Sequence, residues 1–192
     1  VFHWNYVYEL PFGRGKRWGS STNPVVAGIF GGWQLSGIGT WQSGTALTVT
    51  AGVGQSPTGA TANRADRIAD GKRDHDGLSR GEKAFQWFET SAYRVPAFVD
   101  PTATRPTRQF GSAGVGTVYG PSFFTYDATA QKNFYIAEKF KLQMRVEVFN
   151  PFNVVMLADP DTNASSVNFG RIRTSNINYT PRNIQLGMRL DF

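Results

Sequence analysis

The residues best suited to catalysis or metal binding are few and widely separated. His3 and His75 are the only histidines, and the sequence contains no cysteine. A zinc site needs three or four converging ligands, and a cysteine–histidine nucleophile needs both residue types. The sequence therefore argues against zinc and thiol chemistry, and His3 fits best as an ordinary polar residue of a strand.

An oxygen-ligand cation site is the next candidate. Asp70, Asp74, Asp76 and Gly77 have a faint similarity to a calcium-binding loop. The regular acidic spacing and the distant bidentate glutamate of such a loop are missing, so we interpret the segment as a solvated loop. The glycines of residues 111–116 precede neither a helix nor the lysine of a phosphate loop. We predict no metal and no cofactor.

Residues for covalent or acid–base catalysis are also not placed by any motif. Ser43 and Gly44 lack the strand–turn–helix context of a nucleophile elbow, and no pair of carboxylates stands at a spacing that suggests a shared cleft. The net charge of +6 comes from lysines and arginines spread along the chain, not from a basic run. We therefore predict that the chain is not an enzyme and does not bind nucleic acid.

The composition points to a membrane protein that crosses with strands. Aromatic residues make up 14% of the chain, 21 residues are glycine, and the mean hydropathy is −0.34. The sequence has no apolar stretch of 18 residues, so no membrane helix is expected. Many rings with little overall hydrophobicity are typical of outer-membrane barrels, in which only alternate residues meet lipid.

Alternation of apolar and polar residues predicts an all-β chain with five strands, and residues 1–192 are expected to form one structural unit. The clearest alternation begins at Phe140, and a register slip of one residue would invert every side chain of that strand. We place the strands near residues 2–10, 33–50, 122–134, 140–150 and 183–192.

Each strand pattern separates two faces. In a barrel, one face would meet lipid and the other a wet lumen, where mid-strand charges can pair. The residues predicted to face lipid are Leu142, Met144, Val146, Leu186 and Met188. Those predicted to face the lumen are Lys141, Gln143, Arg145, Glu147 and Arg189. Lys132 falls on the apolar side, where a lysine can extend toward an interface.

The connections differ in length. Short links are expected after Leu10 and Phe134, with a short turn or helix within residues 20–29, and long ones after Thr50 and Asn150. Residues 51–120 show no sustained period and are predicted to form a long, mobile external loop. Inside it, Ser79-Arg80-Gly81-Glu82 has the spacing of a capping box and predicts one or two helical turns.

Alternating short and long connections favour an antiparallel transmembrane barrel with long extracellular loops. Aromatic residues near the predicted strand ends fit the rings of side chains found at membrane interfaces; they are Phe2, Trp4, Trp33, Trp41, Phe134, Tyr135 and Phe140. A soluble β-sandwich explains the alternation too, because its outer face is solvated. In that alternative, a carbohydrate-binding module, Trp33, Trp41 and Trp87 would stack on a sugar.

The end of the sequence carries a recognisable motif. The last eight residues, Gln185-Leu186-Gly187-Met188-Arg189-Leu190-Asp191-Phe192, resemble the β-signal by which the barrel-assembly machinery recognises outer-membrane proteins. The resemblance assigns this recognition to Gln185, Gly187, Leu190 and Phe192.

Three further stretches resemble the barrel end of Oar-like TonB-dependent receptors: Gly32-Trp33-Gln34-Leu35-Ser36-Gly37 with Gln42-Ser43-Gly44-Thr45, then Trp87-Phe88, then Glu147-Val148-Phe149-Asn150-Pro151-Phe152-Asn153. The likeness covers nearly the whole chain in the same order. It implies the C-terminal strands of a larger barrel of about 22 strands around a plugged lumen.

The resemblance also implies a function. A receptor of this kind resides in the bacterial outer membrane and imports a nutrient such as an oligosaccharide, a peptide or a metal chelate. Its expected partners are outer-membrane lipid, the barrel-assembly machinery, an unidentified solute, and the TonB complex through an N-terminal region that this sequence does not include. A passive porin or adhesion barrel is the remaining alternative.

Overall fold

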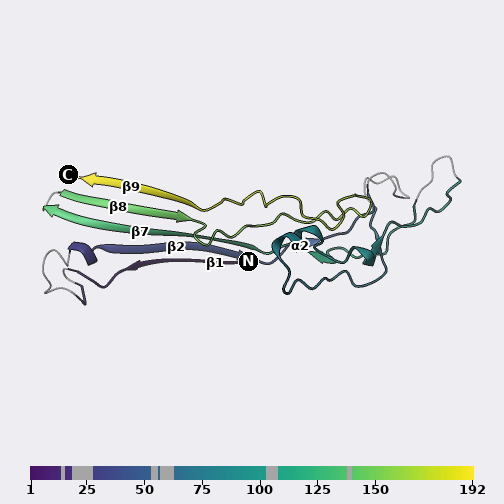
Figure 1. The fold of residues 1–192 in the computed structure, drawn as a ribbon, viewed down its shortest axis with the longest axis horizontal. Coiled ribbons are helices and arrows are strands. Elements are labelled where there is room, and N and C mark those ends of the chain that lie inside the picture. Colours follow the sequence, from purple (N-terminus) through teal and green to yellow (C-terminus); the bar gives the residue numbers. More distant parts are fainter. Residues whose placement is uncertain (14–15, 19–27, 53–55, 57–62, 103–107, 138–139) are drawn as a thin grey trace. The chain divides into compact units, whose positions relative to one another are not determined.

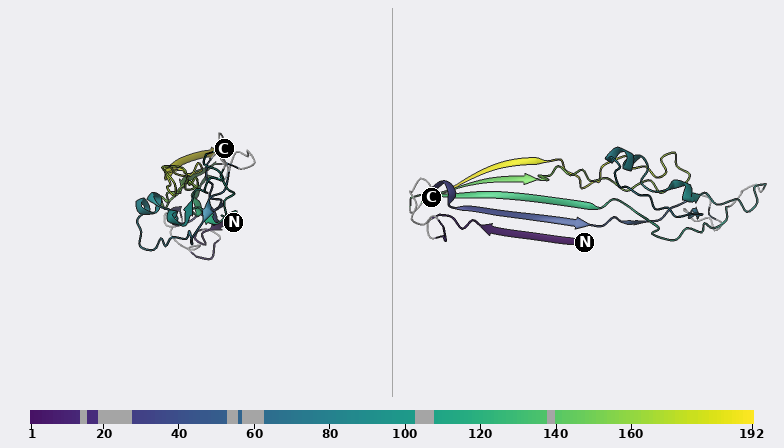
Figure 2. Two further views of the ribbon diagram at one scale, coloured as in Figure 1. Left: turned by 90° about the vertical axis from the view of Figure 1, so that its right-hand side faces the viewer. Right: turned by 60° about the horizontal axis from the view of Figure 1, so that its bottom comes forward.

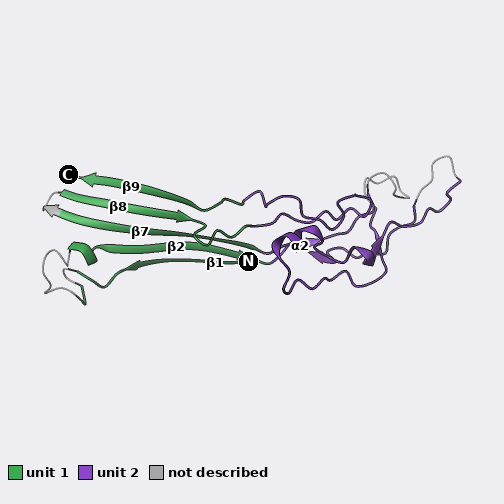
Figure 3. Cartoon of the chain, viewed as in Figure 1, with its two compact units in different colours: residues 1–42, 123–155, 179–192 green, residues 43–122, 156–178 purple. Residues whose placement is uncertain are grey.

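The computed structural model describes residues 1–13, 16–18, 28–52, 56, 63–102, 108–137 and 140–192. The chain forms two compact units (Figure 3). Unit 1 contains residues 1–42, 123–155 and 179–192, and unit 2 contains residues 43–122 and 156–178. Unit 2 is thus assembled from the two long connections between strands of unit 1.

Unit 1 is a single antiparallel sheet. Its strands lie side by side in the order β1-β2-β7-β8-β9, so that every pair of sheet neighbours is antiparallel (Figures 1 and 2). The strands are β1 Phe2–Glu9, β2 Trp33–Gln42, β7 Phe123–Ala137, β8 Phe140–Phe149 and β9 Asn183–Asp191. All five strands predicted from the alternation are present.

Two strand boundaries differ from the prediction. β7 continues to Ala137, beyond the expected end at residue 134, and residues 138–139 of the link to β8 lie outside the described part of the chain. β2 ends at Gln42, whereas the sequence predicted a strand over residues 33–50. The alternation in residues 46–50 belongs to a different sheet.

A close backbone contact follows the end of β2. Gly44 lies so close to the backbone of Gly120 that a Cβ added there would overlap the Gly120 carbonyl. Beyond this contact, β3 (Ala46–Leu47) pairs with β6 (Val118–Tyr119) in unit 2. Periodicity alone does not reveal such a change of partner, because both stretches share the same alternation.

Unit 2 has short elements. They are β3, β4 (Asp66–Arg67), α2 (Arg80–Phe85), η1 (Thr90–Ala92), β5 (Tyr93–Arg94) and β6, with β4 pairing to β5. The two long connections are joined by backbone hydrogen bonds: Thr50 donates to the carbonyl of Thr162 over 2.9 Å, and Ala164 donates to that of Thr50 over 2.7 Å.

The sequence predicts an irregular, mobile segment over residues 51–120. This prediction is wrong about the packing, because part of the segment forms a buried core. Phe88 and Tyr93 are buried and make an edge-on ring contact with centroids 5.9 Å apart. Phe169, from the other connection, packs edge-on against Phe88 at 5.2 Å. Small residues complete the cluster: Val49, Ala65, Ala92, Ala113 and Val118. Because this core is shared between two segments that are far apart in the sequence, neither segment shows a periodic pattern that predicts it.

The predicted capping box of α2 is confirmed. The Ser79 hydroxyl accepts a hydrogen bond from the Glu82 N–H at 3.3 Å, and the Ser79 N–H donates to the Glu82 carboxylate at 2.8 Å. The Ser79 hydroxyl also donates to that carboxylate at 2.6 Å. These bonds favour the charged carboxylate and hold the pKa of Glu82 below its ordinary value of 4.5.

The connections from β1 to β2 and from β7 to β8 belong to unit 1. Residues 10–32 join β1 to β2 and are longer than the short link that was expected there, whereas β7 and β8 are joined at residues 138–139. Residues 28–30 are helical, which confirms the expected turn as far as it falls within the described residues; residues 19–27 lie outside them. No helix in the described part of the chain is long and apolar enough to span a membrane.

The capping box makes α2 sensitive to acid. Because the folded-state pKa of Glu82 is lowered, its stabilisation of α2 is present above pH 4.5 and is lost as the pH falls through the lowered value. We expect hydrogen exchange at the Lys83 and Gln86 amides, corrected for intrinsic rates, to accelerate over that range. Ser79→Ala should accelerate it about fivefold at neutral pH.

Glu82→Gln is the matched control, since it keeps an acceptor and removes the titration. Exchange in this variant should show no such acid dependence. An equally strong dependence in the Glu82→Gln variant would assign the effect to another group.

Candidate functional site: the two faces of the sheet

The register of the sheet aligns the strand patterns. Directly opposed residues of antiparallel strands share a face. One row across the sheet runs from Trp33 through Lys132 and Met144 to Met188. The next row on the same face runs from Tyr8 through Leu35, Ala130 and Val146 to Leu186. The separate alternations predicted from the sequence thus form two continuous faces.

The first of these, which we call the apolar face, unites all five residues predicted to face lipid. Several of its side chains are strongly exposed, including Leu186 at 80% and Met188 at 71%. Unit 1 therefore leaves a continuous apolar surface uncovered, which in a soluble protein would be expected to meet a second layer. The predicted residues on this face are Leu142, Met144, Val146, Leu186 and Met188.

Aromatic rings on β1 cover glycines on β2. Trp4 stands opposite Gly39, and a Cβ added to Gly39 would overlap the Trp4 ring. Tyr6 stands opposite Gly37, where an added Cβ would lie 2.7 Å from the Tyr6 ring. The Tyr6 hydroxyl is hydrogen-bonded to that of Tyr126 at 2.7 Å. The two glycines thus leave room for rings that lie across the strand.

This arrangement extends into an aromatic cluster at one end of the apolar face. The Trp4 ring stacks on Phe2 at 5.6 Å and on Tyr126 at 6.3 Å, with Phe124 at 6.0 Å. Phe152, just beyond β8, stacks on Tyr126 at 5.6 Å. The cluster couples β1, β2, β7 and the turn after β8 through side chains as well as through the backbone.

Lys132 is the exception on the apolar face. It is 6% exposed, and its ammonium donates to the carbonyls of Ile29 at 2.6 Å and Gly31 at 2.8 Å. Its Nζ also lies 4.8 Å from the Trp33 ring centroid and 5.0 Å from that of Phe134. The sequence predicted a lysine extended toward an interface; instead it is enclosed by the chain itself.

The opposite face, which we call the polar face, carries paired polar side chains. Arg145 and Glu147 form an ion pair at 3.5 Å, and Arg189 pairs with Asp191 at 2.7 Å. Gln143 donates to Asn133 at 3.1 Å. Further contacts join Gln34 to Gln131 and His3 to Thr40. The five residues predicted to face the lumen share this face: Lys141, Gln143, Arg145, Glu147 and Arg189.

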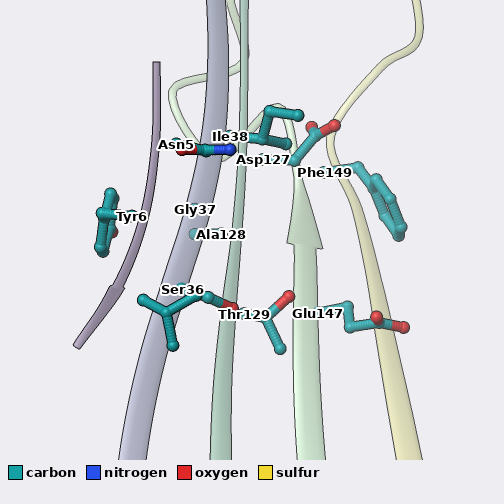
Figure 4. Close-up of a pocket in the computed structure, with 11 residues that line it drawn as sticks. Asn5, Tyr6, Ser36, Gly37, Ile38, Asp127, Ala128, Thr129, Glu147 and Phe149 are labelled. Atoms are coloured by element: carbon teal, nitrogen blue, oxygen red, sulfur yellow. The ribbon is translucent and has the colours of Figure 1, made fainter. Parts of the chain in front are cut away.

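The polar face is hollowed at one place. A hollow of about 380 Å³ spans β1, β2, β7 and β8 (Figure 4). Asp127 and Glu147 contribute carboxylates to its lining, and three apolar residues of this parity, Val7, Ile38 and Phe149, also line it. The remaining lining residues are Asn5, Tyr6, Ser36, Gly37, Ala128 and Thr129. The sheet is therefore hollowed on the side that carries the charges.

Comparison with known proteins decides the family. A family model described as an outer membrane beta barrel domain matches residues 1–185. The chain belongs to this family. Neither the comparison with curated proteins nor that with solved structures gave a match. The sequence-based assignment to an antiparallel outer-membrane barrel is thus confirmed, and this barrel domain resides in the bacterial outer membrane.

The four residues of the resemblance to a β-signal fall on and after the edge strand β9 of the barrel domain. Gln185 and Gly187 share the polar face, opposite Glu147 and Arg145. Leu190 lies on the apolar face, and Phe192 follows the strand with 92% of its surface exposed. The side chains of Gln185, Leu190 and Phe192 are exposed.

Other residues that the sequence singled out belong to different units of the chain. Trp33 and Trp41 lie on the apolar face, and Trp87 lies in unit 2, where its Nε1 donates to the carbonyl of Tyr119. His75 also lies in unit 2, and its ring makes a tilted contact with that of Trp87, with centroids 4.4 Å apart. Within the described residues, no group of three or more His, Cys, Asp and Glu side chains is placed to hold a metal ion.

The cover of glycine by aromatic rings was not predicted from the sequence. We expect Gly39→Ala to lower the free energy of unfolding of the barrel domain by about 1–3 kcal/mol, because the new methyl must displace the Trp4 ring. Denaturant titration of the folded protein in detergent measures this.

Gly187→Ala is the matched control, because its added Cβ meets nothing nearer than 4.0 Å. Both variants are refolded in vitro, so that recognition by the assembly machinery, to which Gly187 is assigned, does not enter the comparison. It should leave the stability almost unchanged. Equal effects of the two substitutions would mean that the loss of glycine itself, and not the Trp4 contact, sets the stability.

Proposed function

We propose that the chain is the C-terminal portion of the barrel of a TonB-dependent outer-membrane receptor that imports a nutrient. The proposal combines membership of the outer membrane beta barrel domain family with the resemblance of three stretches to Oar-like receptors. The observation that carries its membrane part is the register of the sheet, which keeps one face mainly apolar and the other mainly polar across the five strands.

In this proposal the apolar face meets lipid. A strand of about ten residues is long enough to cross the hydrocarbon layer when tilted, and β2 and β8 each have 10 residues. The exposure of Leu186 and Met188 is then satisfied by acyl chains. The lipid of the outer membrane is thus the first partner of the chain.

The polar face correspondingly lines the lumen. Ion pairs such as Arg145–Glu147 and the carboxylates of the hollow need water or polar partners, which a solvated or plugged lumen supplies. We infer that these side chains position a plug or a passing solute and perform no chemistry. Transport, not catalysis, is the role that fits them.

The connections orient the barrel. Residues 43–122 and 150–182 leave the sheet at one end, whereas the C-terminal ends of β1, β7 and β9 lie at the other (Figure 1). Outer-membrane barrels have short periplasmic turns and longer external loops. We therefore assign unit 2 to the extracellular side and Phe192 to the periplasmic side, where the barrel-assembly machinery would recognise β9.

A passive porin or an adhesion barrel is the alternative. Both share the two-faced sheet, but neither needs a plug or a TonB complex. The soluble carbohydrate-binding sandwich loses its support, because the chain belongs to an outer-membrane barrel family.

Conductance and binding separate the receptor from the porin. In planar lipid bilayers, we expect the full-length gene product to show no steady ion current, because a plugged lumen passes no ions. It should also bind the purified periplasmic domain of the TonB protein, which can be measured by calorimetry. A steady current without TonB binding would contradict the receptor and establish the porin.

A further inference from the structure

We infer that the helical turn at residues 28–30, which precedes β2, is a membrane-surface anchor that inserts into the interfacial layer of the glycerophospholipid leaflet. The inference rests on the proposed function, specifically on the assignment of the apolar face to lipid. It adds a second, non-strand contact with the membrane and gives Lys132 a role.

The turn lies against the lipid side of the sheet, as its hydrogen bonds show. Trp33 and Lys132 are opposed in the register and share the apolar face. The Trp33 Nε1 donates to the Ile29 carbonyl at 3.0 Å, and the Lys132 ammonium donates to the carbonyls of Ile29 and Gly31. Both side chains reach the turn from the apolar face, so the end of the turn is held on that side.

The side chains of the turn have the chemistry of an anchor. Ile29 is 56% exposed and Phe30 is 60% exposed. The preceding residue, Gly28, also borders open space, because a Cβ added to it would have no neighbour within 4 Å. An aliphatic and an aromatic side chain exposed together at the edge of a lipid-facing surface are typical of segments that lie in the interface. The occupant continuous with the apolar face is lipid.

The backbone of the turn explains the lysine. Carbonyls at the end of a helical turn have no partner within the turn and are costly to leave unpaired near hydrocarbon. The Lys132 ammonium bonds two of them, and the Trp33 and Phe134 rings flank its charge. A charge that would otherwise be unfavourable on this face is thereby stabilised by backbone dipoles, and the turn is fixed to the sheet.

Close backbone packing also holds residues 31 and 32, which follow the turn. A Cβ added to Gly13 would lie 2.7 Å from the Cα of Gly31, and Gly32, with φ +73°, approaches the Asn133 carbonyl. The Gly32 carbonyl in turn accepts from the Asn133 N–H at 2.9 Å. Residues 31 and 32 are therefore held in place by backbone contacts. The exposed side chains of Ile29 and Phe30 precede this fixed segment.

Spin labelling tests the anchor directly. The 192 residues contain no cysteine, so Phe30→Cys introduces the one thiol of this region in the full-length gene product. The protein is reconstituted in vesicles of phosphatidylethanolamine and phosphatidylglycerol. We then compare collision of the label with oxygen, which concentrates in hydrocarbon, and with a water-soluble nickel chelate. The label should lie within about 5–10 Å of the headgroup level.

Two labels on the strands make failure informative. Leu186→Cys tests the lipid assignment of the apolar face, and Gln143→Cys reports the polar face. We expect the oxygen-to-nickel ratio to be severalfold higher at positions 30 and 186 than at 143. Water accessibility at position 30 alone would overturn the anchor and leave the proposed function standing. Water accessibility at both 30 and 186 would overturn the lipid assignment and the anchor together.

A separate set of variants tests the role of Lys132. In the Phe30→Cys background, Lys132→Met should shift the label severalfold toward the nickel chelate, because the turn loses its attachment. Lys132→Arg keeps hydrogen-bond donors and should retain the depth, which separates loss of the contact from general misfolding. Lys141→Met, which removes a cation from the polar face, is the control and should leave the depth of the label unchanged. An unchanged label in Lys132→Met would overturn the role of Lys132.

Discussion

The structure of unit 1 depends on the register of its five strands. Side chains alternate with a period of two, so a slip of one residue between any two strands would place charges among the apolar side chains. The pairing of Met144 with Lys132 and Met188, and of Val146 with Ala130 and Leu186, keeps the faces separate across the sheet. A membrane requires this separation, because backbone groups must pair with one another and side chains must meet two different solvents.

Side-chain contacts support the same register. The rings of Trp4 and Tyr6 fit only where the opposing residues on β2 are glycines, which ties the position of β1 to that of β2. The Tyr6–Tyr126 hydrogen bond extends this tie across β2 to β7. Lys132 fixes the other end by holding the turn at residues 28–30. Both ends of the apolar face are thus specified by contacts that a slipped register would break.

The sequence predicted the parts that follow local rules. Alternation located all five strands, and the Ser79–Glu82 spacing located α2. It did not predict that the alternation after Gln42 continues in another sheet, because the contact of Gly44 with Gly120 joins distant residues. The core around Phe88 and Phe169 also has no local pattern, since its members come from two separate connections. The burial of Lys132 depends on carbonyls about a hundred residues away, which no periodicity can show.

The central claim is that the apolar face meets lipid and the polar face meets the lumen. The most direct measurement is the free energy of folding of the full-length gene product into lipid vesicles, with one arginine introduced on either face of β8. Val146→Arg should lower this stability by about 2–4 kcal/mol, because it places a charge near the middle of the hydrocarbon layer. Gln143→Arg, on the polar face of the same strand, should change it by no more than about 0.5 kcal/mol. Equal losses, or a larger loss for Gln143→Arg, would contradict the assignment of the two faces.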